Sequence, residues 1–359
     1  MHRGATLREI AARAGVTPAA ASRALKDAAD IGEETKRRVR RIAAELDYRP
    51  NEVARSLREC RTRTIGLSVF HLDNPHFGRL ALAVQRRIEA QGFATLLAPA
   101  EAPLRDAVEL LRWRCVDGMI VTANLLTEQD INLWQRCRNS APFVVLGNAS
   151  GLPVDSVTTD REAGTRDAIR ALIALGHRDI GYLPMPSGPH AGDRGTRVAG
   201  FRQAMAEADL PIREEWMFVA PRDMEGARNA ALAVLSRPRR PTALFCHSDL
   251  CAWGVLRAAK ELGLNVPRDL SIVGFDNTEM AAYGLLALTT VDQPAPLVAE
   301  TAVSLLLERI AHPDAPPRQV VLEARLIVRE STGPAPNRPR RAGNRQDRKP
   351  RPSPRALTP

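Results

Sequence analysis

The hydrophobic pattern of the first sixty residues predicts three short helices. Apolar residues at positions 7, 10, 11 and 14 form one helix face, and Gly15 ends that helix. Thr6 and Glu9 have the capping-box spacing that marks its start. Thr17 and Pro18 are suited to an N-cap and a first helical position, which predicts a second helix to about residue 26. Two short helices joined by a glycine-containing turn form a helix-turn-helix.

The third helix is expected over 33–46. Its apolar positions 39, 42, 43 and 46 face inward, and we expect Lys36 and the arginines at 37, 38, 40 and 41 to face solvent or phosphate. On spacing alone, this region is either a DNA-binding head or a small helical bundle with a basic surface.

From residue 62 onward, short β-branched runs alternate with amphipathic segments, which predicts a parallel sheet with helices on both faces. The pattern starts again after about residue 160, so we expect two similar lobes with a ligand cleft at the carboxyl ends of the strands. The predicted strands are 64–70, 93–98, 118–122, 143–147, 179–183, 243–246 and 271–275. The predicted helices are 80–90, 104–113, 127–139, 166–175, 198–208 and 250–262.

Composition narrows the class of protein. The sequence contains no apolar run of membrane-spanning length and no signal-peptide pattern, which predicts a cytoplasmic location without membrane contact. The five cysteines are scattered, and no metal-ligand or cofactor motif is present, so no metal or cofactor is expected. None of the nucleotide-binding, metalloprotease or hydrolase motifs occurs, so we expect that the protein is not an enzyme.

The net charge of +10 lies mainly in the two ends of the chain. The proline-rich, basic segment 331–359 is expected to be disordered.

Longer stretches of the sequence resemble the lactose/galactose repressor family of bacterial transcriptional regulators. The first is TLREIAARAGVTPAAASRAL, and the segment YRPNEVARSLR is similar to the family's hinge. Further matches are IGLSVFHLDNPHF, LIALGHRDIGYL, RVAGFRQAMAEADL and LSIVGFDN, so the resemblance spans about residues 6–332. It implies an all-α helix-turn-helix head joined to a two-lobed α/β sensor with parallel sheets, like that of type I periplasmic binding proteins. It explains His177, in LGHRDI, as structural.

The implied domains are a DNA-binding head (1–47), a hinge helix and linker (48–61) and a sensor (62–330). Within the sensor, the N-lobe comprises about 62–160 and 291–320, and the C-lobe about 161–290 and 321–330. The resemblance implies that the second helix lies in the major groove as the recognition helix. Pro18 and Ala19 take the usual base-reading positions but donate no side-chain hydrogen bond, so direct readout is expected to rest on Thr17, Ser22 and Arg23. Leu57 is the expected minor-groove wedge, with plain packing against the sensor as the alternative. The full set of expected DNA-binding residues is Thr6, Thr17, Pro18, Ala19, Ser22, Arg23, Asn51, Ala54 and Leu57.

For the effector site, the resemblance points first to Arg197 and Asp276. Arg197 is expected to bind ligand oxygens, and Asp276 is expected to accept hydrogen bonds from the ligand; an inter-lobe salt bridge between them is the alternative. Family members commonly have an aromatic residue near position 221 and asparagine near 161, where this chain has Pro221 and Arg161. The full set of expected effector-binding residues is Asn74, His76, Phe77, Asn124, Asn148, Asp193, Arg197, Ser248 and Asp276.

The resulting prediction is a homodimeric repressor that binds a palindromic, double-stranded DNA operator. A small-molecule effector, expected to be a sugar or sugar derivative, controls its affinity for DNA. The alternative is a stand-alone small-molecule binding protein without a role at DNA.

Overall fold

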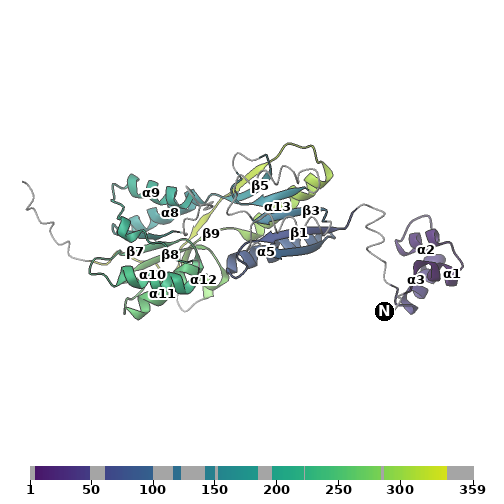
Figure 1. Ribbon diagram of the computed structural model, residues 1–359, viewed down its shortest axis with the longest axis horizontal. Helices are drawn as coiled ribbons and strands as arrows, with labels where there is room; N and C mark the ends of the chain where they lie inside the picture. Colours follow the sequence, from purple (N-terminus) through teal and green to yellow (C-terminus); the bar gives the residue numbers. More distant parts are fainter. Residues whose placement is uncertain are drawn as a thin grey trace, which may run out of the picture.

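The computed structural model of the chain describes residues 5–48, 61–99, 116–122, 142–149, 153–184, 196–221, 223–283 and 287–337. These residues form a three-helix head and two α/β lobes (Figure 1). None of the described helices combines the length and apolar character that crossing a membrane requires.

The head contains α1 (Leu7–Ala14), α2 (Pro18–Leu25) and α3 (Glu33–Glu45). The three helices share one core, to which the predicted apolar faces contribute Ile10, Ala21, Val39 and Ile42. Gly15 adopts the left-handed conformation that ends α1. The sharp turn that this glycine permits brings α2 against α1, as the sequence predicted.

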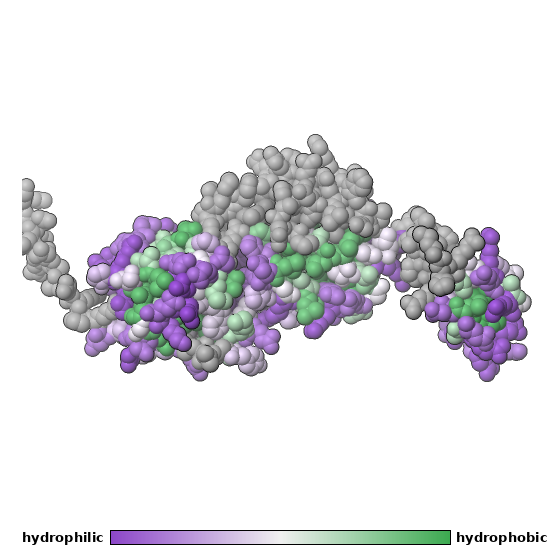
Figure 2. All heavy atoms as spheres, turned by 60° about the horizontal axis from the view of Figure 1, so that its bottom comes forward, coloured by the Kyte–Doolittle hydropathy of each residue, from purple (hydrophilic) through white to green (hydrophobic). Residues whose placement is uncertain are grey.

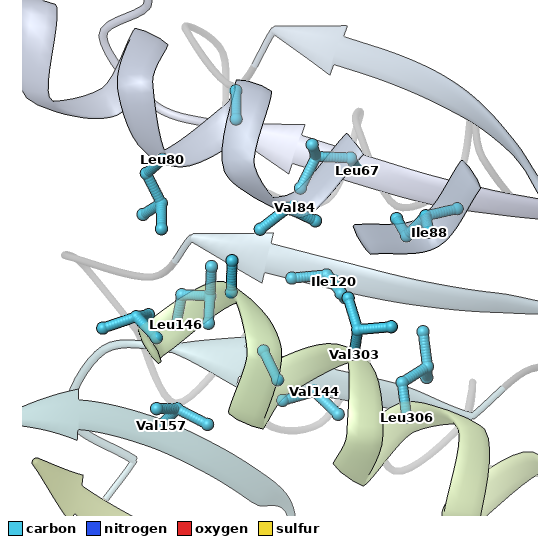
Figure 3. Close-up of a cluster of buried hydrophobic side chains, with 14 of the residues drawn as sticks. Leu67, Leu80, Val84, Ile88, Ile120, Val144, Leu146, Val157, Val303 and Leu306 are labelled. Carbon is cyan, nitrogen blue, oxygen red and sulfur yellow. The ribbon is translucent and has the colours of Figure 1, made fainter. Parts of the chain in front are cut away.

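The N-lobe is built on a parallel sheet of six described strands in the order β10-β5-β4-β3-β1-β2. Helices α5 (Pro75–Ala90) and α13 (Ala295–Ala311) cover one face of this sheet. Figure 3 shows Val84 and Ile88 of α5, with Val303 and Leu306 of α13, packed over Ile120 and neighbouring strand residues. The strands are β1 (Thr64–Val69), β2 (Ala94–Pro99), β3 (Gly118–Thr122), β4 (Phe143–Leu146), β5 (Asp155–Thr159) and β10 (Gln319–Leu322).

The C-lobe sheet has the order β11-β9-β8-β7-β6, parallel except for the antiparallel pair β11 and β9. Helices pack on both of its faces: Leu244 and Cys246 contact the cluster of α10 and α11, whereas Phe245 contacts that of α8 and α9. The strands are β6 (Ile180–Leu183), β7 (Ala243–Cys246), β8 (Ser271–Asp276), β9 (Thr289–Asp292) and β11 (Arg325–Ile327). The helices are α8 (Arg161–Ala174), α9 (Thr196–Glu207), the 3₁₀ helix η1 (Glu214–Trp216), α10 (Met224–Leu235), α11 (Asp249–Glu261) and α12 (Glu279–Tyr283).

The chain passes between the lobes three times within the described residues. It leaves the N-lobe after β5, returns after β9 to form α13 and β10, and crosses again to form β11. The carboxyl ends of the parallel strands in both sheets therefore face the region between the lobes, where ligands of such folds bind.

Two sensor helices begin earlier than the hydrophobic period predicted. Helix α5 starts at Pro75 rather than near residue 80, and α8 starts at Arg161 rather than near residue 166. In each case a side-chain cap sets the start: Asn74 accepts a hydrogen bond from the His76 N–H, and Asp160 accepts one from the Ala163 N–H. The predicted helices 104–113 and 127–139 lie outside the described residues, and β5, β9, β10, β11, α10, α12 and α13 were not predicted.

The first residues of the segment 331–359, which was expected to be disordered, are folded against the C-lobe. Ser331 is fully buried, and its hydroxyl donates to the Ile272 carbonyl at 2.6 Å. The Ala335 N–H donates to the Leu175 carbonyl, and the Gly333 carbonyl lies 3.1 Å from Nε2 of the buried His177. Residues 331–335 are therefore part of the C-lobe, because they satisfy polar groups of its sheet, and His177 has the predicted structural role. Residues 338–359 lie outside the described residues.

Candidate functional site

Two regions of the structure have the chemistry of a functional site: the second helix of the head and a pocket between the lobes. In the head, Thr6 and Glu9 form the predicted capping box, with the Thr6 N–H donating to Glu9 at 2.7 Å. The Thr17 hydroxyl caps α2 by accepting from the Ala20 N–H at 3.1 Å. Both predicted helix starts are confirmed.

The solvent-facing edge of α2 carries the residues expected to contact DNA. Thr17, Pro18, Ala19 and Arg23 are exposed, and Ser22 is half-buried. Figure 2 shows hydrophilic side chains around a smaller apolar patch on the head. Arg23 forms an exposed ion pair with Asp30 at 2.7 Å, which fixes the direction of its guanidinium without burying it. Because such an exposed pair is weak, a phosphate or a guanine edge can replace Asp30 at small cost.

Lys36 is the one basic residue of α3 that the sequence pattern placed wrongly. It was expected to face solvent or phosphate, but it is 6% exposed. Its ammonium group lies 2.9 Å from Glu33 and 3.2 Å from Asp27. Two carboxylates at the start of the helix and in the preceding turn thus hold it inward, so Lys36 stabilises the head. The predicted hinge residues Asn51, Ala54 and Leu57 lie outside the described residues.

The sensor contains a pocket of about 540 Å³, including the part open to solvent. The N-lobe contributes Phe70, His71, Asn74, His76 and Phe77, the C-lobe contributes Arg161, Arg197, His247, Ser248 and Asp276, and Gln293 lies where the chain crosses between them.

The N-lobe wall of this pocket is aromatic. Phe70 and Phe77 meet edge to face with ring centroids 6.2 Å apart, and His71 and His76 each pack edge-on against one of these rings. Burial, followed by the positive charges of Arg161 and Arg197, lowers the pKa of His76 to about 3. His76 is therefore neutral at physiological pH and contributes an uncharged ring to the wall.

The C-lobe wall is charged and buried. The guanidinium of Arg197 lies 3.9 Å above the centre of the Phe275 ring, and the side chain is 5% exposed. Asp276 is 4% exposed, and its Oδ1 accepts a hydrogen bond from Gln293 at 2.7 Å. Burial raises the pKa of Asp276, whereas Arg197 and Gln293 favour its charged form.

The backbone after β8 has an unusual conformation that carries Asp276 into the pocket. Asp276 has φ of 119° and Asn277 has φ of 50°, a region that residues with side chains seldom adopt. The Asn277 side chain fixes this turn by donating to Asp292 at 2.9 Å and accepting from Arg329 at 2.7 Å. From the other lobe, Arg79 donates to the Asn277 carbonyl at 2.6 Å, which ties α5 to the pocket wall.

Most of the expected effector residues meet in this pocket. Asn74, His76, Phe77, Arg197, Ser248 and Asp276 all line it, whereas Asn148 is exposed after β4 and does not. Asn124 and Asp193 lie outside the described residues. Ser248 also caps α11 by accepting from the Cys251 N–H.

The sequence pattern missed Phe70, His71, Arg161, His247 and Gln293. Phe70, His71 and His247 directly follow strands β1 and β7, a position that the rule for ligand sites in parallel sheets could have identified. Among the described residues, no cluster of three His, Cys, Asp or Glu side chains is placed to hold a metal ion.

Comparison with known proteins finds matches to both the helix-turn-helix head and the sensor. Residues 6–51 match the lacI family of bacterial regulatory proteins, and residues 169–332 match a periplasmic binding protein-like domain. The chain is 35% identical to the HTH-type transcriptional repressor PurR of Yersinia pestis bv. Antiqua (strain Antiqua) over 339 residues, which cover 93% of this chain and 98% of the relative.

Solved structures give the same result. The lac repressor dimer bound to operator and the anti-inducer ONPF matches with a TM-score of 0.81 and 25% identity, over 92% of this chain and all of that one. A complex of the transcriptional regulator CelR with cellobiose matches with a TM-score of 0.68 and 28% identity, over 91% of this chain and 99% of that one. A ribose-bound lacI family regulator from Enterococcus faecium matches with a TM-score of 0.67 and 29% identity, over 76% of this chain and 99% of that one. The chain therefore belongs to the lacI family of bacterial regulatory proteins and is a ligand-responsive, DNA-binding transcriptional repressor.

Proposed function

We propose that the pocket between the lobes is the effector site and that its occupant is a sugar or sugar derivative. The observation that carries this proposal is the pairing of an aromatic wall on one lobe with buried Arg197 and Asp276 on the other. An aromatic wall packs against the C–H face of a sugar ring, and the charged pair binds its hydroxyl oxygens and hydrogens. The cellobiose and ribose bound to two similar regulators support this class of ligand.

The proposed mechanism couples this pocket to the operator through the lobes. A ligand that touches both walls favours one separation of the lobes over others, and the hinge segment 48–61 transmits that preference to the paired heads. The Arg79–Asn277 hydrogen bond depends on the same separation, because its two residues belong to different lobes. Coupling of this kind between two sites typically changes the affinity for the second ligand, here operator DNA, by about 5- to 150-fold.

In the same proposal, the exposed edge of α2 contacts base edges and phosphates through Thr17, Ser22 and Arg23. Pro18 and Ala19 offer apolar contact, and Thr6, Asn51, Ala54 and Leu57 complete the interface. Head, hinge and sensor have the boundaries 1–47, 48–61 and 62–330. The protein then acts at DNA in the bacterial cytoplasm, and its function includes no enzymatic step.

The test is an operator-binding titration with a Arg197→Ala variant. The operator is first selected from random double-stranded DNA, and affinity is then measured by fluorescence anisotropy with and without a panel of sugars, sugar acids and polyols. We expect Arg197→Ala to bind operator within about twofold of the wild type, since Arg197 lies in the sensor, and to lose the effector response. A variant that responds at the same ligand concentration as the wild type would remove Arg197 from the effector site.

A further inference from the structure

The charges that line the pocket indicate more about the effector than its general class. Two guanidinium groups, those of Arg161 and Arg197, face one carboxylate, that of Asp276, among the described lining residues. The three histidines that line the pocket contribute no negative charge. Of these, His76 is neutral at physiological pH, because its pKa is about 3. The described lining thus carries two positive charges and one negative charge, while Asp193, the other acid among the expected effector residues, lies outside the described residues.

Two other carboxylates near the pocket do not line it and are engaged in hydrogen bonds of their own. Asp249 accepts three hydrogen bonds, two from Thr278 and one from Thr290, at 2.6 to 2.9 Å. Asp292 accepts a hydrogen bond from the Asn277 side chain, and Arg79 donates one to the backbone carbonyl of the same asparagine. These groups stabilise the turn after β8, and a ligand in the pocket meets the lining residues instead.

The helices around the pocket add to its positive potential. His76 is the second residue of α5, Arg161 the first of α8 and Arg197 the second of α9, while Ser248 is the N-cap of α11. Four helices of at least twelve residues therefore begin at the lining. The first turns of α5 and α9 contain no acidic residue, whereas the carboxylates of Asp160 and Asp249 lie at the starts of α8 and α11 and offset their dipoles. Both guanidinium groups and the starts of α5 and α9 favour an anion in the pocket.

We infer that the effector carries an acidic group, a carboxylate or a phosphate, on a polyhydroxylated ring, and that Arg161 is the residue that selects for it. Arg161 and Arg197 bind the acidic group with charged hydrogen bonds. Asp276 accepts hydrogen bonds from ring hydroxyls, and the aromatic wall formed by Phe70 and Phe77 covers the ring. The inference rests on the proposed function, because it takes the same pocket as the effector site.

The experiment compares neutral sugars with their acidic counterparts on the full-length dimer. Isothermal titration calorimetry is done with glucose, glucuronate and glucose 6-phosphate, with ribose and ribose 5-phosphate, and with galactose and galacturonate; adenine is included as a nucleobase. We expect at least one acidic member to bind tenfold or more tightly than its neutral counterpart. Carboxylate and phosphate arms within the panel show which acid the site takes.

Three variants assign this preference to Arg161. Arg161→Gln removes the charge and is expected to lower affinity for the acidic ligand by about tenfold or more while leaving the neutral counterpart within about twofold. Arg161→Lys keeps the charge and is expected to keep most of the preference. Arg170→Gln is the matched control, because Arg170 lies on the same helix but is exposed and pairs with Glu207. Thermal unfolding of each variant confirms that it is folded.

Three results would overturn the inference: neutral sugars or adenine binding at least as tightly as the acids, no acidic member binding at all, or Arg161→Gln behaving like Arg170→Gln. If a neutral sugar changes operator affinity and Arg197→Ala abolishes that response, the proposed function stands and only the inference fails. If an acidic ligand binds through Arg161 but operator affinity does not change, the inference about the pocket stands and the proposed regulation fails.

Discussion

Replacing Gly200 with alanine tests how closely the pocket depends on the packing of α8 against α9. A Cβ atom on Gly200 would lie 2.3 Å from the Glu162 carbonyl oxygen and 3.2 Å from the Arg166 nitrogen. Both atoms belong to the backbone and cannot rotate away, so the two helices would have to separate by about 1 Å to restore ordinary van der Waals contact. Glu162 follows Arg161 directly, and Gly200 lies one turn after Arg197. The separation would therefore also move the two pocket arginines apart.

The size of the effect follows from two opposing contributions. Alanine stabilises a helix interior by about 1 kcal/mol relative to glycine. Overpacking costs about 1–3 kcal/mol and more when backbone blocks the new atom, so we expect Gly200→Ala to lower the free energy of unfolding by about 1–2 kcal/mol. For a body of this size that is a fall of about 3–6 °C in Tm.

Gly78→Ala is the matched control, measured with Gly200→Ala by thermal unfolding. Gly78 also lies inside a helix, α5, but its nearest atom to a new Cβ is the Leu72 oxygen at an ordinary 3.7 Å. Because only the helix propensity changes there, we expect a rise in Tm of about 3 °C. Effector affinity should fall in the Gly200 variant and not in the Gly78 variant. The packing argument is refuted if Gly200→Ala unfolds at or above the wild-type temperature with unchanged effector affinity.

Three further variants address the lobes, pH and the hinge. Arg79→Gln should remove the hydrogen bond to Asn277 and speed amide hydrogen exchange at residues 276–279, and unchanged exchange there would show that the contact does not hold the turn. The pKa of His76 is about 3 in the folded protein and about 6.5 in the unfolded chain. The unfolded chain therefore binds the proton first, and the free energy of unfolding falls by up to about 1.4 kcal/mol per pH unit as pH falls from about 6.5 to 3. Denaturant titrations of the wild type and His76→Gln should show a smaller acid loss in the variant, and equal slopes would contradict the assignment. Leu57→Ala should weaken operator binding tenfold or more in an anisotropy titration while leaving sensor unfolding unchanged, and wild-type affinity would rule out the wedge.

Local sequence signals predicted the head well, because its helices begin and end at side-chain caps. Thr6, Gly15 and Thr17 each act on backbone groups within a few residues, so their role is visible in the sequence alone. The burial of Lys36 was not visible in this way. It depends on Asp27, which reaches Lys36 because the chain turns through a left-handed residue at that point.

In the sensor, strands with continuous apolar runs, such as 118–122 and 243–246, were predicted to the residue, because burial on both faces leaves a short run without polar positions. Expected effector residues at strand ends, such as Asp276 and Ser248, meet in one pocket because parallel strands end at one edge, although Asn148 after β4 does not line it. Gln293 could not be predicted in this way. It reaches the pocket where the chain passes from β9 to α13, and only the three-dimensional path of the chain places it beside Asp276.

The three passages of the chain between the lobes also determine the order in which the protein can mature on the ribosome. Synthesis delivers β1 to β5 first, then nearly all of the C-lobe, and only afterwards α13 and β10. Val303 and Leu306 of α13 complete the core that Ile120 and Val144 begin, so one face of the first lobe is not fully covered until α13, Ala295–Ala311, has emerged. A nascent chain of this repressor thus presents part of an apolar sheet to chaperones while the segment between β5 and α13 is made. A chain truncated before residue 295 would have a C-lobe lacking β11 and residues 331–335 and an N-lobe that cannot close.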